Sequence, residues 1–159
     1  MIRSLLESYR KHVFDKRLAT VRPIIEAAFI ARDLPTAWGM AFAMQESAFK
    51  ASATNLTDPG DVARGGSFGL FQMSYKTALT ECGYHGPATG LLDPQVNAAL
   101  AAKFISILQK RHYVNGPNDL ENIASGYNSG KPRDKAPPST RDVYVTNVIL
   151  FAGEFGWTG

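Results

Sequence analysis

Residues 36–49 read TAWGMAFAMQESAF, an apolar stretch that contains a single carboxylate. Pro35 ends any preceding helix, and Thr36 starts the next one. The large side chains of this helix predict that it packs in a core, and Glu46 follows them near its end. Most glutamates in helices are solvated, but a carboxyl group in apolar surroundings has a raised pKa and can hold a proton. The stretch therefore raises the question of which kind of carboxylate Glu46 is.

Other parts of the chain also show helical spacing of apolar residues or helix start signals. The predicted helices cover residues 4–17, 20–32, 74–82, 93–111, 118–128 and 139–155. Their start signals are Thr20, Ser74, Asp93-Pro94, Asn118 with Glu121, and Ser139 with Asp142. Because no sustained alternating segment occurs, we expect an all-α fold of about seven or eight helices. At most a small β-hairpin is expected near residues 55–68, within one domain spanning residues 1–159.

The composition excludes several classes of protein. The chain of 159 residues has 17 basic and 14 acidic side chains, a net charge of +3, which suits an acidic partner or plain solubility. The sequence has no long run of like charges, so it does not predict nucleic-acid binding. Cys82 is the single cysteine, and His12, His85 and His112 are scattered, so we expect neither a disulfide, a zinc site nor a cofactor.

No apolar segment is long enough to cross a membrane, so we expect no stable membrane insertion. The first residues, MIRSLLESYRKHVFDKRL, lack the apolar core of a signal peptide. We therefore expect synthesis in the cytosol, with a removed signal as the alternative.

A glycine-rich motif, GSFGLFQMS, occupies residues 66–74. Its glycines permit positive φ and close backbone approach, and Gln72 offers both a donor and an acceptor for a sugar. A plain turn before a helix is the alternative. A phosphate loop is excluded because no Lys-Ser or Lys-Thr follows the glycines.

Two further motifs lie downstream. In SGYNSG, residues 125–130, Tyr127 could stack on a sugar face and Asn128 could hydrogen-bond it, although a helix end capped by Gly130 explains the same letters. In YVTNVI, residues 144–149, the position of Tyr144 on a helix face is typical of a core residue.

Taken in order, QESAF, GLFQ, LLDPQVNAALAAKFI, GYNSG and YVTNVI resemble the catalytic domain of soluble lytic transglycosylases, in the goose-type lysozyme superfamily. The resemblance covers about residues 24–151. It implies a lysozyme-like fold and cleavage of the bond between N-acetylmuramic acid and N-acetylglucosamine in peptidoglycan, with a 1,6-anhydro product.

The resemblance also implies roles for individual residues. Glu46 would be the catalytic acid and then base, and the Tyr144 hydroxyl would lie near it. The implied glycan-binding residues are Ser47, Phe71, Gln72, Met73, Tyr127, Asn128 and Tyr144. Phe71 stands where the family usually has methionine, and Ser125, Gly126 and Ser129 depart from the alanines of the family pattern.

The reaction type has an alternative, because the stretch from Glu46 to Gln72 is longer than usual and contains Asp58 and Asp61. Either aspartate could activate water, as the second carboxylate of a muramidase does. Goose-type lysozymes have an aspartate at the position of Ser74, and its absence favours the transglycosylase. A β-turn is the structural explanation of both aspartates.

A non-catalytic glycan-binding or virion structural protein is the alternative from a different class. An acid in an apolar site lowers the stability of the protein, and a pure glycan-binding protein has no reason to retain such an acid. We therefore expect a monomeric enzyme that acts on glycan strands in the periplasm or cell wall. The small chain without a signal peptide predicts a phage lysin or virion-associated enzyme, with a secreted bacterial enzyme or a clipped domain of a larger protein as the alternatives.

Overall fold

The computed structural model describes residues 2–56 and 65–159, with the backbone alone for residues 2–6 and 9. Its α-helices are α1 (Ile2–Ile30), α2 (Thr36–Ser47), α4 (Tyr75–Thr80), α5 (Pro94–Leu108), α6 (Leu120–Ser129) and α7 (Val145–Glu154). Shorter turns of helix are η1 (Ala88–Leu92), η2 (Arg133–Lys135) and η3 (Ser139–Tyr144). The strands are β1 (Thr54–Asn55), β2 (Ser67–Phe68) and β3 (Met73–Ser74). The expected all-α class is confirmed.

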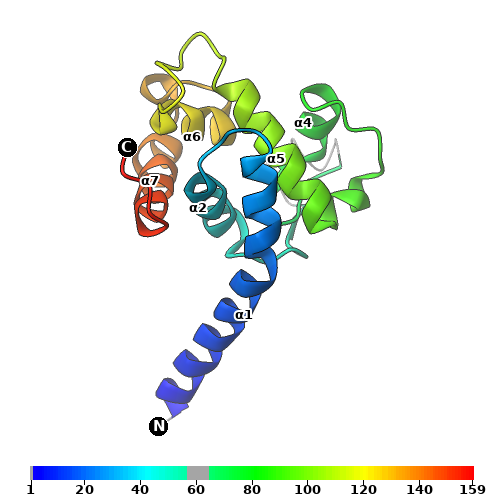
Figure 1. The fold of residues 1–159 in the computed structure, drawn as a ribbon, viewed down its shortest axis with the longest axis vertical. Coiled ribbons are helices and arrows are strands. Elements are labelled where there is room, and N and C mark those ends of the chain that lie inside the picture. The colour runs from blue at the N-terminus through cyan, green and yellow to red at the C-terminus, as the bar shows by residue number, and fades with distance from the viewer. Residues whose placement is uncertain (1, 57–64) are drawn as a thin grey trace.

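Helix α2 lies at the centre of the fold, between α1 and α7 (Figure 1). Its residues from Ala37 to Ala43 are all buried, which explains why this part of the helix is apolar on every side. Gly39 marks the crossing with α1, since a Cβ there would lie 2.6 Å from a methyl carbon of Ile25. The backbones of α1 and α2 can therefore approach closely only with glycine at this position.

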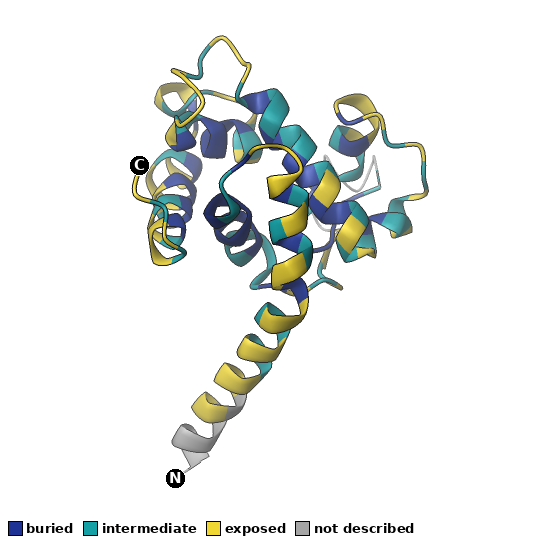
Figure 2. Cartoon of the chain, in the orientation of Figure 1, coloured by how far each residue is buried: buried dark blue, intermediate teal, exposed yellow. Residues whose placement is uncertain are grey.

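The two helices expected at residues 4–17 and 20–32 are one continuous helix, α1. Thr20 does not cap a new helix; its hydroxyl donates to the Lys16 carbonyl oxygen at 2.9 Å. The second half of α1 packs on α2 and α5, whereas the first half extends away from the body of the molecule (Figure 1). The described side chains of the first half are largely exposed (Figure 2). Where the two halves of α1 meet, the Phe14 ring makes an edge contact with the Phe49 ring, with ring centres 5.4 Å apart.

The sheet is antiparallel in the order β1-β2-β3. Thr54 pairs with Phe68, and Phe68 also pairs with Met73. The hairpin expected near residues 55–68 is thus present, with a third strand that the sequence did not predict. The β-turn expected at Asp58 to Asp61 lies outside the described residues.

Local start signals located several helices correctly. Ser74 caps α4 by accepting from Thr77 N, and Asp93 caps α5 by accepting from Gln95 N and Val96 N, with Pro94 at the first helical position. The cap of α6 is Asp119 rather than the expected Asn118, because the Asp119 carboxylate accepts from Asn122 N. Ser139 forms no side-chain cap; it begins a π-helical turn, η3, that runs directly into α7.

Candidate active site

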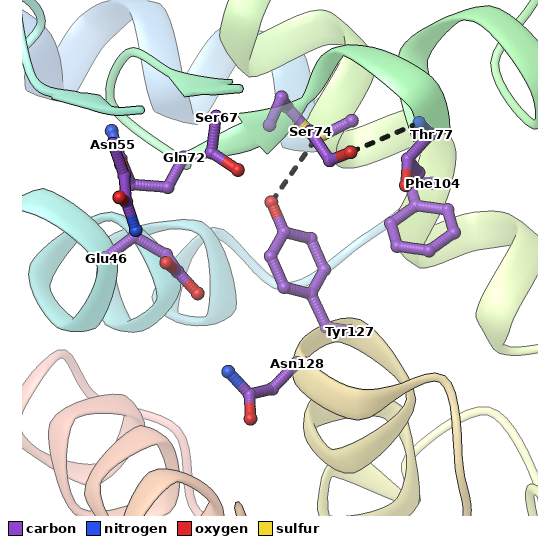
Figure 3. Close-up of a pocket in the computed structure, with 10 residues that line it drawn as sticks. Glu46, Asn55, Ser67, Gln72, Ser74, Thr77, Phe104, Tyr127 and Asn128 are labelled. Carbon is purple, nitrogen blue, oxygen red and sulfur yellow. Dashed lines mark hydrogen bonds between the residues drawn. The ribbon is translucent and has the colours of Figure 1, made fainter. Parts of the chain in front are cut away.

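Glu46 lies in a cleft between the end of α2, the sheet, α4 and α6 (Figure 3). The described lining of this cleft is mostly uncharged and polar: Glu46, Asn55, Ser67, Gln72, Met73, Ser74, Thr77, Phe104, Tyr127 and Asn128. Hydroxyl and amide groups are the usual partners of neutral sugar hydroxyls. The cleft therefore has the chemistry of a carbohydrate-binding site around a single acid.

The Glu46 carboxyl is an acid adapted to neutral pH. Burial raises its pKa from 4.5 to about 7, although a hydrogen bond from the Tyr144 hydroxyl to Glu46 Oε1 acts in the opposite direction. Tyr144 lies at the junction of η3 and α7, 98 positions along the chain from Glu46. The resemblance predicted this hydroxyl near Glu46, and the structure places it there.

The raised pKa of Glu46 makes a prediction about stability. The native state holds this proton more tightly than the unfolded chain, so native stability is lost as pH rises from 4.5 to about 7. Glu46→Gln removes the titration, and we expect it to stabilise the protein by about 2–3 kcal/mol at pH 8. Near pH 4 the variant and the wild type should have equal stability.

Chemical denaturation at the two pH values measures this difference. Glu154→Gln, the same substitution at an exposed position at the end of α7, is the matched control. Equal stabilities of Glu46→Gln and wild type at both pH values would contradict the raised pKa of Glu46.

The GLFQ turn, residues 69–72, is fastened by residues from the other sequence motifs. Ser47 Oγ donates to the Leu70 carbonyl oxygen at 2.8 Å, and Tyr127 Oη donates to the Phe71 carbonyl oxygen at 2.8 Å. The Gln72 amide nitrogen donates to the carbonyl oxygens of Ala53 and Gly69, both at 3.0 Å. The two hydrogen bonds from the Gln72 amide nitrogen hold this side chain at the cleft, and neither of them involves its side-chain oxygen.

Asn97 of α5 holds the same turn from the core side. Its fully buried amide donates to the Phe68 and Leu91 carbonyl oxygens at 2.8 and 2.9 Å and accepts from Phe71 N at 2.8 Å. Gly69 has φ +78°, and a Cβ there would lie 2.5 Å from the Leu91 carbonyl oxygen. Glycine at this position therefore permits both the turn and the close approach of Asn97.

Tyr127 and Asn128 bring α6 to the cleft. The Tyr127 ring packs between Phe42 and Phe104, with ring centres 4.9 and 5.5 Å away, so its orientation is fixed by the core. Asn128 is exposed, and its side-chain oxygen accepts a 2.6 Å hydrogen bond from Thr140 Oγ1. The Asn128 amide nitrogen is then the group left to face a ligand.

The remaining predicted site residues differ in their positions. Phe71 is not a cleft wall: its ring is fully buried and stacks on Phe29 with ring centres 5.8 Å apart. Met73 lies at the cleft floor but is 2% exposed, and its sulfur contacts the Tyr127 hydroxyl at 3.3 Å. Asp58 and Asp61, the suggested second carboxylates, lie outside the described residues.

Sequence reasoning missed several residues that build the cleft. Asn55, Ser67, Thr77 and Phe104 line it, and Thr140 orients Asn128. Single polar residues in two-residue strands or a six-residue helix give no periodic signal, so Asn55, Ser67 and Thr77 could not be found from a pattern. Asn97 lies within the LLDPQVNAALAAKFI motif and could have been singled out as a polar residue on an apolar helix.

Residues 2–56 and 65–159 contain no group of three or more His, Cys, Asp or Glu side chains that could hold a metal ion. In the same parts of the chain, no helix is both long and apolar enough to cross a membrane.

The chain belongs to the transglycosylase SLT domain family, whose model matches residues 24–142. That range includes Glu46, the GLFQ turn and Tyr127-Asn128, whereas Tyr144 lies two positions beyond its end. The match supports a peptidoglycan-degrading enzyme. A comparison with curated proteins found no match.

A solved structure has the same fold. It is lytic transglycosylase Slt of Pseudomonas aeruginosa, determined as an inactive mutant, with a TM-score of 0.65 and 23% identity over 85% of the present chain. The present chain covers 24% of that protein, or about a quarter of its length. The lysozyme-like fold expected from the sequence motifs is confirmed.

Proposed function

We propose that the chain is a peptidoglycan lytic transglycosylase that uses Glu46 as its one catalytic carboxyl group. The bond cleaved is the β-1,4 linkage between N-acetylmuramic acid and N-acetylglucosamine. The observation that carries this proposal is the cleft itself: among its described lining residues, Glu46 is the single carboxylate. Family membership supplies the substrate class.

In the first step, Glu46 donates its proton to the oxygen that links the two sugars, and the bond from that oxygen to C1 of muramic acid breaks. A carboxyl group whose pKa is about 7 is still largely protonated just below neutral pH, so it can act as the acid there. The uncharged cleft surroundings favour the neutral acid before the step.

In the second step, the Glu46 carboxylate accepts the proton of the 6-hydroxyl of the same muramic acid as that oxygen bonds to C1. The product is a 1,6-anhydro ring, and Glu46 regains its proton, so no water is consumed. Because the nucleophile is already part of the substrate, its effective concentration is very high and a second carboxylate is not required. The hydrogen bond from Tyr144 stabilises the carboxylate between the two steps.

A hydrolase with Asp58 or Asp61 as its second carboxylate is the competing reaction on the same fold. Ser74, which occupies the position of the aspartate in goose-type lysozymes, lines the cleft and caps α4 through Thr77 N. A serine hydroxyl at this position cannot act as a carboxylate base, which favours the transglycosylase.

The products distinguish the two reactions. Purified peptidoglycan is digested, and the fragments are weighed by mass spectrometry. We expect muramic acid ends that lack one water relative to reducing ends. A digest with reducing ends alone would contradict the proposal, and no release of fragments at all would contradict enzymatic activity.

Tyr144→Phe tests the second step. Without the hydroxyl, the Glu46 carboxylate loses a stabilising donor, so its pKa rises and the alkaline limb of the pH–rate profile moves to higher pH. We expect kcat to fall about ten- to hundredfold, the rate equivalent of one hydrogen bond to a charged group. An unchanged profile would show that Tyr144 does not act on Glu46.

A further inference from the structure

A second hollow opens beside the catalytic cleft and shares two side chains with it. Thr77 of α4 and Phe104 of α5 line both spaces. They lie at the end of the cleft opposite Glu46 (Figure 3). The hollow, of about 420 Å³, adds basic and aromatic side chains: Lys76, Arg111, His112 and Tyr113. A ligand that extends past Phe104 therefore leaves a neutral cleft and enters a basic hollow.

The two spaces differ in charge. Among its described residues, the cleft lining has no lysine or arginine. In the hollow, Lys76 and Arg111 are both exposed, and Glu81, the one carboxylate of its described lining, pairs with Arg111 at 3.0 Å. The described lining of the hollow thus carries an excess of positive charge. Such a surface favours an anionic group.

Tyr113 gives the hollow a fixed aromatic wall. Its ring makes an edge contact with His112, with ring centres 5.3 Å apart. Its hydroxyl lies against α6, where a Cβ on Gly126 would be 2.7 Å from that oxygen. Glycine at position 126, in the helix that carries Tyr127 and Asn128, therefore permits the close approach of Tyr113 to α6.

We propose that this hollow binds the peptide stem of the substrate through the free carboxylates of the stem. The inference rests on the proposed function, since it assumes that peptidoglycan occupies the cleft. The sugar backbone of that polymer is neutral, whereas its stems carry carboxylates and branch from the muramic acid rings. The uncharged cleft and the basic hollow match this division, and Lys76 and Arg111 are the residues that recognise the stem.

The test compares two versions of one soluble glycan strand, with native stems and with the stem carboxylates converted to amides. Amidation keeps the length of the stem and removes its charge. The double variant Lys76→Gln/Arg111→Gln removes the same interaction from the protein side. Lys110→Gln, at an exposed lysine next to Arg111 but outside the hollow lining, is the matched control.

We expect the double variant to lower kcat/KM on native strands by about tenfold relative to the wild type. On amidated strands the double variant and the wild type should have the same kcat/KM. The wild type should lose a similar factor when the stems are amidated. Lys110→Gln should match wild type on both strands, and rising salt should narrow the difference between strands.

An equal loss on both strands, or no loss on native strands, would overturn the stem site. In either case the wild type would still cleave amidated strands, so the proposed reaction would stand. If the wild type cleaves neither strand, the proposed function fails, and the stem site fails with it. Melting temperatures of the variants, which we expect to equal that of wild type, separate a binding defect from unfolding.

Discussion

Glu46→Gln is expected to lower peptidoglycan cleavage by about a hundred- to ten-thousandfold, the usual contribution of a positioned general acid. Glutamine keeps the size of the side chain and can still accept the hydrogen bond from Tyr144, but it has no proton of comparable acidity to donate. The loss should be in kcat, because the other residues that line the cleft are untouched.

The controls for this variant are Asp58→Asn and Asp61→Asn, which remove the other two candidate carboxylates of the stretch between Glu46 and Gln72. Fragment release from purified peptidoglycan measures all three variants. We expect both asparagine variants to keep wild-type activity. A large loss in either of them would indicate a second catalytic carboxylate and favour hydrolysis.

Asn97→Asp is expected to destabilise the fold by about 3 kcal/mol or more at pH 8, a large part of the total stability of a domain. The introduced carboxylate can still accept from Phe71 N, but it turns an oxygen toward the Phe68 and Leu91 carbonyl oxygens in place of the two amide protons. It would also be a buried charge without a partner.

The pH dependence identifies the cause of this destabilisation. A protonated carboxyl can donate to one of the two carbonyl oxygens, so the stability deficit of Asn97→Asp should shrink toward pH 4. Denaturation midpoints at both pH values measure it. Asn118→Asp, the same change at an exposed position, should be nearly neutral, and a deficit of equal size there would show that the effect is not specific to the buried amide.

Features of the fold that depend on local chemistry could be predicted from the sequence. Ser74 and Asp93-Pro94 mark real helix starts, because capping involves residues two or three positions apart. The division of α1 into two helices was wrong because Thr20 forms its hydrogen bond within the helix instead of ending it. Propensity and spacing cannot decide between these two uses of a threonine.

The candidate site depends on contacts between distant parts of the chain. The pairing of Glu46 with Tyr144 joins two residues that are 98 positions apart in the sequence, and only the family resemblance indicated it. The sequence did not show how deeply the apolar residues beside Gln72 are buried. Phe71 was therefore placed in the cleft, although its side chain lies in the core. Alternation along a short turn does not show which side faces solvent.

Digestion of purified peptidoglycan in heavy-oxygen water tests the central claim most directly. Hydrolysis would place one solvent oxygen at C1 of each new muramic acid end, whereas attack by the sugar's own 6-hydroxyl places none there. We predict 1,6-anhydro ends without the heavy isotope in the wild-type digest. Heavy oxygen in the new reducing ends would contradict a transglycosylase that works through Glu46 alone.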